Sequence, residues 1–146
     1  MSQNRCVRPR GFNLLELTVV LAVVAILSTI LLPKAAGFID AIEVRGAVTE
    51  IEALFSVARH IAIARAAQSS LDMDPASGII SVRVGTDTVR KREIASAHGV
   101  TLQTTRASIT YSPTGIGYGA ANLTLIVTRK LSADTIYVSR LGRVRH

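Results

Sequence analysis

The stretch that decides the fold is residues 12–32, which read FNLLELTVVLAVVAILSTILL. Glu16 is the only charged residue in this run. A helix of that length, at about 1.5 Å per residue, spans roughly 31 Å, the thickness of the hydrocarbon core of a bilayer. The run therefore predicts a membrane-spanning helix near the N-terminus. It also accounts for a mean hydropathy of +0.38 in a chain of net charge +7.

The charges on either side of this run predict its orientation. Arg5, Arg8 and Arg10 precede it, whereas Lys34 is the only nearby basic residue after it. Basic residues gather on the cytoplasmic side of a membrane span. We therefore expect a cytoplasmic N-terminus, and a C-terminal part outside the cytoplasm. A secretory signal fits less well, because its apolar region is shorter and ends in a small-residue cleavage site.

Glu16 is the unusual residue of the span. A carboxylate at the centre of a membrane costs roughly 2.5–3.5 kcal/mol, and somewhat less near an end, unless it is paired. Residues 12–32 contain no Lys or Arg that could pair with it. The α-amino group of a neighbouring subunit would be a suitable partner if that chain began at Phe12. Such a pairing requires cleavage after Gly11.

Residues 10–17, RGFNLLEL, resemble the class III signal of type IV pilins and type II secretion pseudopilins. That signal combines a basic leader, Gly, Phe, and Glu as the fifth residue after the cut. The resemblance implies that a prepilin peptidase cleaves after Gly11 and methylates Phe12. It also implies assembly with other pilins into a helical filament, in which Glu16 sets the register and Pro33 loosens the helix. An ordinary membrane anchor with an isolated Glu is the competing interpretation.

A helical pattern continues beyond Pro33. Apolar residues recur at steps of three and four along one face: Val44, Val48, Ile51, Phe55, Ala58 and Ala62. This spacing is typical of an amphipathic helix. After a leader over residues 1–11 and a membrane segment over residues 12–36, we expect an amphipathic helical segment over residues 37–72. Its helix is expected to end near residues 68–70.

From residue 77 the apolar period changes to two, which indicates β-strands. Apolar residues alternate with polar ones in three runs: Ile80, Val82 and Val84; Leu123, Leu125 and Val127; Ile136 and Val138. We expect five or six antiparallel strands over residues 73–146, packed on the C-terminal half of the long helix. The result is an α+β, type IV pilin-like fold, which resembles the GspH/FimT-type minor pseudopilins and minor pilins.

Charge is divided between the two halves of the extracytoplasmic part. Residues 35–74 carry a net charge of −3, and residues 75–146 carry +7. Two basic clusters contribute to the second value: Arg90, Lys91 and Arg92, and a tail that contains Arg140, Gly142, Arg143 and Arg145. This opposition would serve lateral packing of subunits or binding of a polyanion.

The basic tail predicts a DNA-binding element. In an extended chain Arg143 and Arg145 project from one face, where they can hold successive phosphates without reading bases. Residues 142–145, GRVR, resemble the Gly-Arg-x-Arg element of minor pilins of DNA uptake, which implies a DNA-binding role for both arginines. The alternative is a basic tail that only keeps an edge strand soluble or contacts acidic neighbours.

No residue pattern predicts catalysis, and we expect no enzyme activity, cofactor or metal site. The histidines are scattered and expected at the surface: His60, His98 and His146. Asp72 and Asp74 are expected in a solvated turn at the helix end, because Ser77 and Arg83 stand where a calcium loop needs Gly and Glu. A single Cys excludes a disulfide scaffold.

The sequence as a whole predicts a filament subunit of the bacterial inner membrane with a periplasmic C-terminal domain. The first interpretation is a minor pseudopilin of the type II secretion pseudopilus, which serves protein export. The alternative is a minor pilin of a type IV pilus that binds DNA during natural transformation. The expected partners are the prepilin peptidase, other pilins or pseudopilins, the membrane and, in the second case, DNA.

Overall fold

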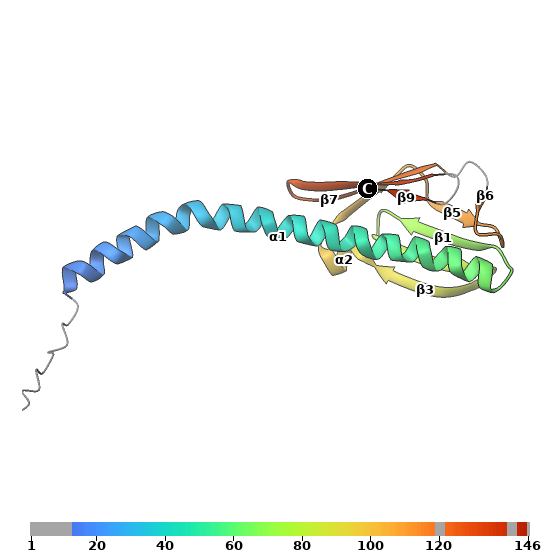
Figure 1. Cartoon of the computed structure of the whole chain (residues 1–146), viewed down its shortest axis with the longest axis horizontal. Coiled ribbons are helices and arrows are strands. Elements are labelled where there is room, and N and C mark those ends of the chain that lie inside the picture. Colours follow the sequence, from blue (N-terminus) through green and yellow to red (C-terminus); the bar gives the residue numbers. More distant parts are fainter. Residues whose placement is uncertain (1–12, 119–121, 140–142, 146) are drawn as a thin grey trace, which may run out of the picture. The chain divides into compact units, whose positions relative to one another are not determined.

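The computed structural model describes residues 13–118, 122–139 and 143–145. It divides into two compact units, residues 1–36 and 37–146. Helix α1 (Leu14–Ala64) contributes to both units and continues through Pro33 (Figure 1). The expected leader over residues 1–11 and Phe12 lie outside the described residues.

The first unit consists of the apolar part of α1. Every large apolar side chain from Leu14 to Leu32 is at least half exposed. The hydroxyl groups of this part are satisfied by its own backbone, since Thr18 donates to the Leu15 carbonyl and Ser28 to the Val24 carbonyl. Such internal pairing is what a lipid environment requires of polar groups. In the described part of the chain, α1 is the one helix long and apolar enough to cross a membrane.

The second unit contains two antiparallel sheets and a short helix, α2 (Ile94–His98). The first sheet has the strand order β3 (Asp87–Glu93), β2 (Ile79–Val84), β1 (Ser69–Asp74), β5 (Ser108–Tyr111) and β6 (Gly117–Tyr118). The second sheet has the order β4 (Thr101–Thr104), β7 (Leu123–Arg129), β8 (Ser132–Val138) and β9 (Val144–Arg145). Figure 1 shows strands of both sheets alongside the C-terminal half of α1.

One hydrophobic core joins α1 to both sheets. The predicted apolar face of the helix is buried throughout: Val44, Val48, Ile51, Phe55, Ala58 and Ala62. The first sheet contributes Leu71, Ile80, Val82, Ile109 and Tyr111, and the second contributes Leu102, Leu125, Val127 and Ile136. The expected α+β arrangement of a long helix with a small antiparallel β-domain is confirmed.

The predicted end of the helix was wrong. Helix α1 ends at Ala64, and β1 occupies residues that were assigned to the helical segment 37–72. Ala66 takes a left-handed φ of 46°, which stops the helix. Strand β1 then buries Ser69, whose hydroxyl donates to the Ala58 carbonyl at 2.7 Å. Asp72 and Asp74 accordingly lie in a strand rather than in a turn at a helix end.

The β-domain also contains more elements than expected. Nine strands are found among the described residues, against the five or six predicted, and α2 was not predicted. Strand β3 was missed because all seven of its residues are exposed, so that its sequence has no apolar alternation. Strands β6 and β9 have only two residues each and are defined by their pairing with β5 and β8.

Candidate functional site

The first candidate site is the apolar surface of α1 over residues 14–32. In water this whole surface would remain hydrated, which is unfavourable, and an exposed apolar patch of this size marks a site of contact with a membrane or a protein. Glu16 is exposed within it and forms no ion pair with another described residue. The surface needs either lipid or the helices of neighbouring subunits to cover it.

The second candidate site is a groove of about 530 Å³ on β7, β8 and β9, which we call the tail groove. It is lined by Asn122, Leu123, Thr124, Tyr137, Val138, Ser139, Arg143 and Arg145. Strand pairing places Arg145 opposite Tyr137, and Tyr137 opposite Thr124. Cross-strand partners share a face of a sheet. Arg143 and Arg145, which were predicted to project from one face, both line this groove.

Hydrogen bonds hold the tail in this position. The Ser139 N–H donates to the Arg143 carbonyl at 2.9 Å, and the Arg143 N–H donates to the Ser139 hydroxyl at 3.3 Å. Of the residues that line the groove, only Arg143 and Arg145 were predicted as site residues; the most prominent of the others is Tyr137. Tyr137 could have been singled out, because it is a large aromatic at an outward position between buried Ile136 and Val138. Arg140 and Gly142 lie outside the described residues.

The cluster of Arg90, Lys91 and Arg92 lies on β3, at one edge of the first sheet. Its side chains do not act together. The Arg92 Nε lies 3.3 Å from a carboxylate oxygen of Glu50 on α1, and Arg90 shares that face by alternation. Lys91 lines a separate groove on the other face, with Asp72 and Arg83. None of the three lines the tail groove, so the two predicted basic clusters form separate surfaces.

His98 lies between two carboxylates of α1, and its predicted exposed position was wrong. Its Nδ1 is 3.0 Å from Glu43 Oε2 and its Nε2 is 3.2 Å from Glu50 Oε2. The side chain is only 20% exposed. Each ring nitrogen thus lies within hydrogen-bond distance of a different carboxylate of α1. Gly46 makes room for it, since a Cβ there would lie 3.2 Å from the ring.

Asp40 of α1 forms an ion pair with Arg129 of β7, in the second sheet. It is 5% exposed, and its Oδ1 accepts from Arg129 Nε at 2.8 Å. Lys130 Nζ lies 3.6 Å from the same oxygen. The Arg129 guanidinium also donates to the His98 carbonyl. We call Asp40, Glu43, Glu50 and their partners the carboxylate clasp. Acidic residues of the 35–74 segment thus pair with basic residues of the 75–146 segment within one subunit.

The remaining histidine and acidic positions do not form a site. His60 is exposed as expected, and its Nδ1 lies 2.8 Å from the carbonyl oxygen of Ser56, one helical turn earlier. His146 lies outside the described residues. No group of three or more His, Cys, Asp or Glu side chains within the described ranges is arranged to hold a metal. In His98 the two ring nitrogens face different carboxylates, which is the geometry of a bridge and not of a chelate.

Tyr111 is a buried polar group without a partner. Its hydroxyl makes no hydrogen bond to any other described group, and only 1% of the residue is exposed. Burial raises the pKa of this phenol to about 12, against a smaller lowering effect of Arg59. The side chain therefore remains neutral at physiological pH and serves as a large core residue.

An apolar N-terminal helix that continues into a small antiparallel β-domain defines the pilin-like class of subunits. The model of one family in this class, GspH, described as type II transport protein GspH, matches residues 47–142. The chain belongs to the GspH family, within the superfamily of type IV pilins and type II secretion pseudopilins. Members of this family are structural subunits. The exposed apolar helix fits a membrane-anchored pilin.

Solved structures share this fold at low sequence identity. The type IV minor pilin FimU of Pseudomonas aeruginosa is 18% identical, with a TM-score of 0.63 over 74% of this chain and 90% of that chain. The minor pseudopilin EpsH of the type 2 secretion system of Vibrio cholerae is 9% identical, with a TM-score of 0.56 over 70% of this chain and 94% of that chain. No curated protein matches the sequence significantly.

Proposed function

We propose that the protein is a minor subunit of a pilin-like filament, held in the inner membrane by α1 before assembly, with its β-domain in the periplasm. One observation carries this proposal. Along a single helix, the large apolar side chains of residues 14–32 are exposed, whereas the apolar face of residues 44–62 is buried in the subunit's own core. Only the first stretch is left for lipid and then for the helices of neighbouring subunits.

Glu16 supplies the specific contact in this assembly. A prepilin peptidase cleaves after Gly11, and Phe12 becomes a methylated N-terminus that remains positively charged. This amine of one subunit pairs with Glu16 of the next, because a lone carboxylate in an apolar layer is unfavourable. The pairing is supported by the lack of any ion-pair partner for Glu16 among the described residues of its own chain.

The filament we favour is the type II secretion pseudopilus, in which the subunit supports protein export. The description of the matching family as a type II transport protein supports this choice, together with the fold shared with EpsH.

Glu16→Ala tests the assembly contact. We expect the variant to insert in the membrane and to be processed normally, because removing a charge favours insertion. We expect it to be at least tenfold depleted from sheared filaments when these are compared with the membrane fraction by immunoblot. Thr18→Ala is the matched control, since it changes a nearby polar side chain bonded only to its own helix. Normal incorporation of Glu16→Ala would contradict the pairing.

Gly11→Ala distinguishes a failure of processing from a failure of assembly in the same experiment. This variant should accumulate as the full-length precursor. The appearance of protein of mature length would remove the prepilin assignment, whatever Glu16→Ala does.

A second candidate function, DNA binding by a type IV pilus minor pilin, is favoured by the tail groove. Arg143 and Arg145 are exposed, line one groove, and have no carboxylate partner among the described residues, unlike Arg92 and Arg129 in the carboxylate clasp. Guanidinium groups in such a position can bind successive phosphates of a nucleic acid. The fold shared with the type IV minor pilin FimU is compatible with this role.

The salt dependence of DNA binding tests the second candidate. We expect the full-length protein in a non-ionic detergent to bind duplex DNA of any sequence, with an affinity that falls as salt rises. Each lost phosphate contact should reduce the log–log slope by about 0.9, so Arg143→Ala/Arg145→Ala should reduce it by about 1.8. Lys91→Ala/Arg106→Ala removes the same charge elsewhere and should leave most of the binding. Equal loss in both double variants would indicate a net-charge effect without a site.

A further inference from the structure

The tail groove contains an aromatic ring that phosphate binding does not use. Tyr137 is 57% exposed, although it stands between Ile136 and Val138, which are buried. Its ring therefore adds nothing to the hydrophobic core. A large aromatic on the solvent side of a sheet contributes little to the fold and is a feature of binding surfaces.

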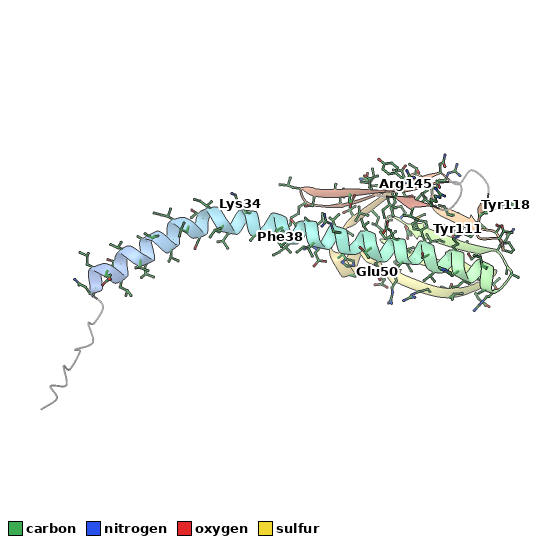
Figure 2. The ribbon with its side chains drawn as sticks, in the orientation of Figure 1. Lys34, Phe38, Glu50, Tyr111, Tyr118 and Arg145 are labelled. Atoms are coloured by element: carbon green, nitrogen blue, oxygen red, sulfur yellow. The ribbon has the colours of Figure 1, made fainter. Side chains whose placement is uncertain are left out.

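The position of Tyr137 within the groove is central. Its strand, β8, lies between β7 and β9, so that Thr124 faces it on one side and Arg145 on the other. Arg143 lines the same groove two residues before Arg145, and Asn122 and Ser139 add polar groups. Figure 2 shows Arg145 on the opposite side of α1 from Glu50, so the groove is separate from the carboxylate clasp. A ring with cations along one side is thus open to a ligand.

The size and chemistry of the groove fit a nucleotide unit. A volume of about 530 Å³ is in the range of sites that hold small organic groups. In duplex DNA the bases are stacked on each other, and a protein that holds only the backbone can use the hydroxyl of a tyrosine but not the face of its ring. In single-stranded DNA every base offers a free face, and stacking on an aromatic side chain improves affinity by about 5- to 150-fold per base.

We propose that the tail groove binds single-stranded DNA, with one base stacked on the ring of Tyr137 and the adjacent phosphates held by Arg143 and Arg145. The proposal deepens the second candidate function and rests on it. It makes the subunit a receptor for unpaired ends or gaps, where a base can leave the stack at little cost. Duplex DNA would bind the same arginines without the contribution of the ring.

The test compares the binding of two DNAs to the native full-length protein and to its variants in a non-ionic detergent. The probes are a labelled 12-nucleotide oligothymidine and a duplex of equal length, and binding is measured by fluorescence anisotropy at low and physiological salt. We expect Tyr137→Leu to weaken binding of the single strand about 5- to 150-fold and to change binding of the duplex less than twofold. Tyr137→Phe keeps the ring and should retain the native affinity for both probes.

A tryptophan at this position reports stacking directly. The chain contains no Trp, so Tyr137→Trp introduces a single emitting indole. We expect oligothymidine to quench its fluorescence with the same midpoint as the anisotropy, and the duplex to quench it much less. Because this variant keeps a large aromatic ring, it also tests the proposal if Tyr137→Leu proves unstable in thermal unfolding.

The outcomes separate this proposal from the one on which it rests. If native protein binds neither DNA, both fail. If Arg143→Ala/Arg145→Ala weakens both probes while Tyr137→Leu changes neither, or changes both equally, DNA binding stands and the stacking proposal is overturned. Polyglutamate that competes as well as oligothymidine would overturn the proposal in favour of a general site for acidic peptides.

Discussion

Gly78→Ala is expected to destabilise the β-domain by about 2–5 kcal/mol, the sum of backbone strain and overpacking. Gly78 has a left-handed φ of 66°, which an L side chain adopts only with strain. A Cβ at this position would overlap the methyl group of Ala95 and lie 3.1 Å from the Ala95 Cα. The second clash is with backbone, and a rotamer change cannot relieve it.

The neighbourhood of Gly78 gives the backbone of α2 little freedom to move away. The Gly78 carbonyl accepts from the N–H of Ile94 at 3.0 Å and of Ala95 at 3.2 Å. Ile94 is fully buried in the core. A shift of α2 would therefore break hydrogen bonds at the start of this helix and disturb the core. It would also move His98, at the other end of α2, away from Glu43 and Glu50.

Gly85→Ala is the matched control for this prediction. Gly85 has a similar φ of 60°, but nothing lies within 4 Å of a Cβ built there. We expect it to cost about 1–2 kcal/mol from strain alone. Thermal unfolding followed by circular dichroism should show a clearly larger decrease in Tm for Gly78→Ala, by several degrees for each additional kcal/mol. Equal decreases in Tm would show that α2 moves away from the new Cβ at no energetic cost, and would contradict the predicted clash with Ala95.

The helical part of the fold could be predicted because its signals are local. The apolar run of residues 12–32 and the stripe from Val44 to Ala62 are each visible in a short window of sequence. The end of α1 was predicted too late because Ala66, which takes the left-handed conformation, is neither Gly nor Asn. Strand β1 buries Leu71 and Met73 between polar residues, but its first buried position is Ser69, so its apolar alternation covers only two residues.

In the candidate sites, too, the features with a local sequence pattern could be predicted, whereas those that depend on distant contacts could not. The shared face of Arg143 and Arg145 follows from the period of an extended chain, and it was predicted. The place of Tyr137 between Thr124 and Arg145 depends on the register of three strands, which no local pattern gives. His98 was assigned to the surface because its carboxylate partners are 55 and 48 residues away in the sequence. Contacts of that separation are decided by the packing of α2 on α1.

Asp40→Ala is expected to destabilise the β-domain by about 3 kcal/mol, the lower end of the cost of breaking a buried ion pair, because Arg129 is a quarter exposed. The loss has two parts. The attraction between Asp40 and Arg129 disappears, and the guanidinium is left partly desolvated with only the His98 carbonyl as an acceptor. Lys130→Ala is the control, since Lys130 is 71% exposed and its pairing with Asp40 should be worth less than about 1 kcal/mol.

A double-mutant cycle separates the ion pair from other effects of these substitutions. Arg129→Met keeps much of the apolar stem and removes the charge. If the pair is what matters, Asp40→Ala/Arg129→Met should be less destabilised in urea than the sum of the single variants, because no unpaired charge remains. Strict additivity would mean that the two side chains contribute independently.

The Asp40–Arg129 pair should also determine how readily the start of the packed part of α1 opens locally from the core. Asp40 is the first buried residue of the second unit, and no described residue nearer its start is buried. Without it, Val44 becomes the first buried attachment of the helix to the core. We expect hydrogen exchange of the amides of residues 40–44 to accelerate in Asp40→Ala more than that of residues 51–58, beyond the change in global stability. Uniform acceleration would instead indicate that the helix and both sheets open only together.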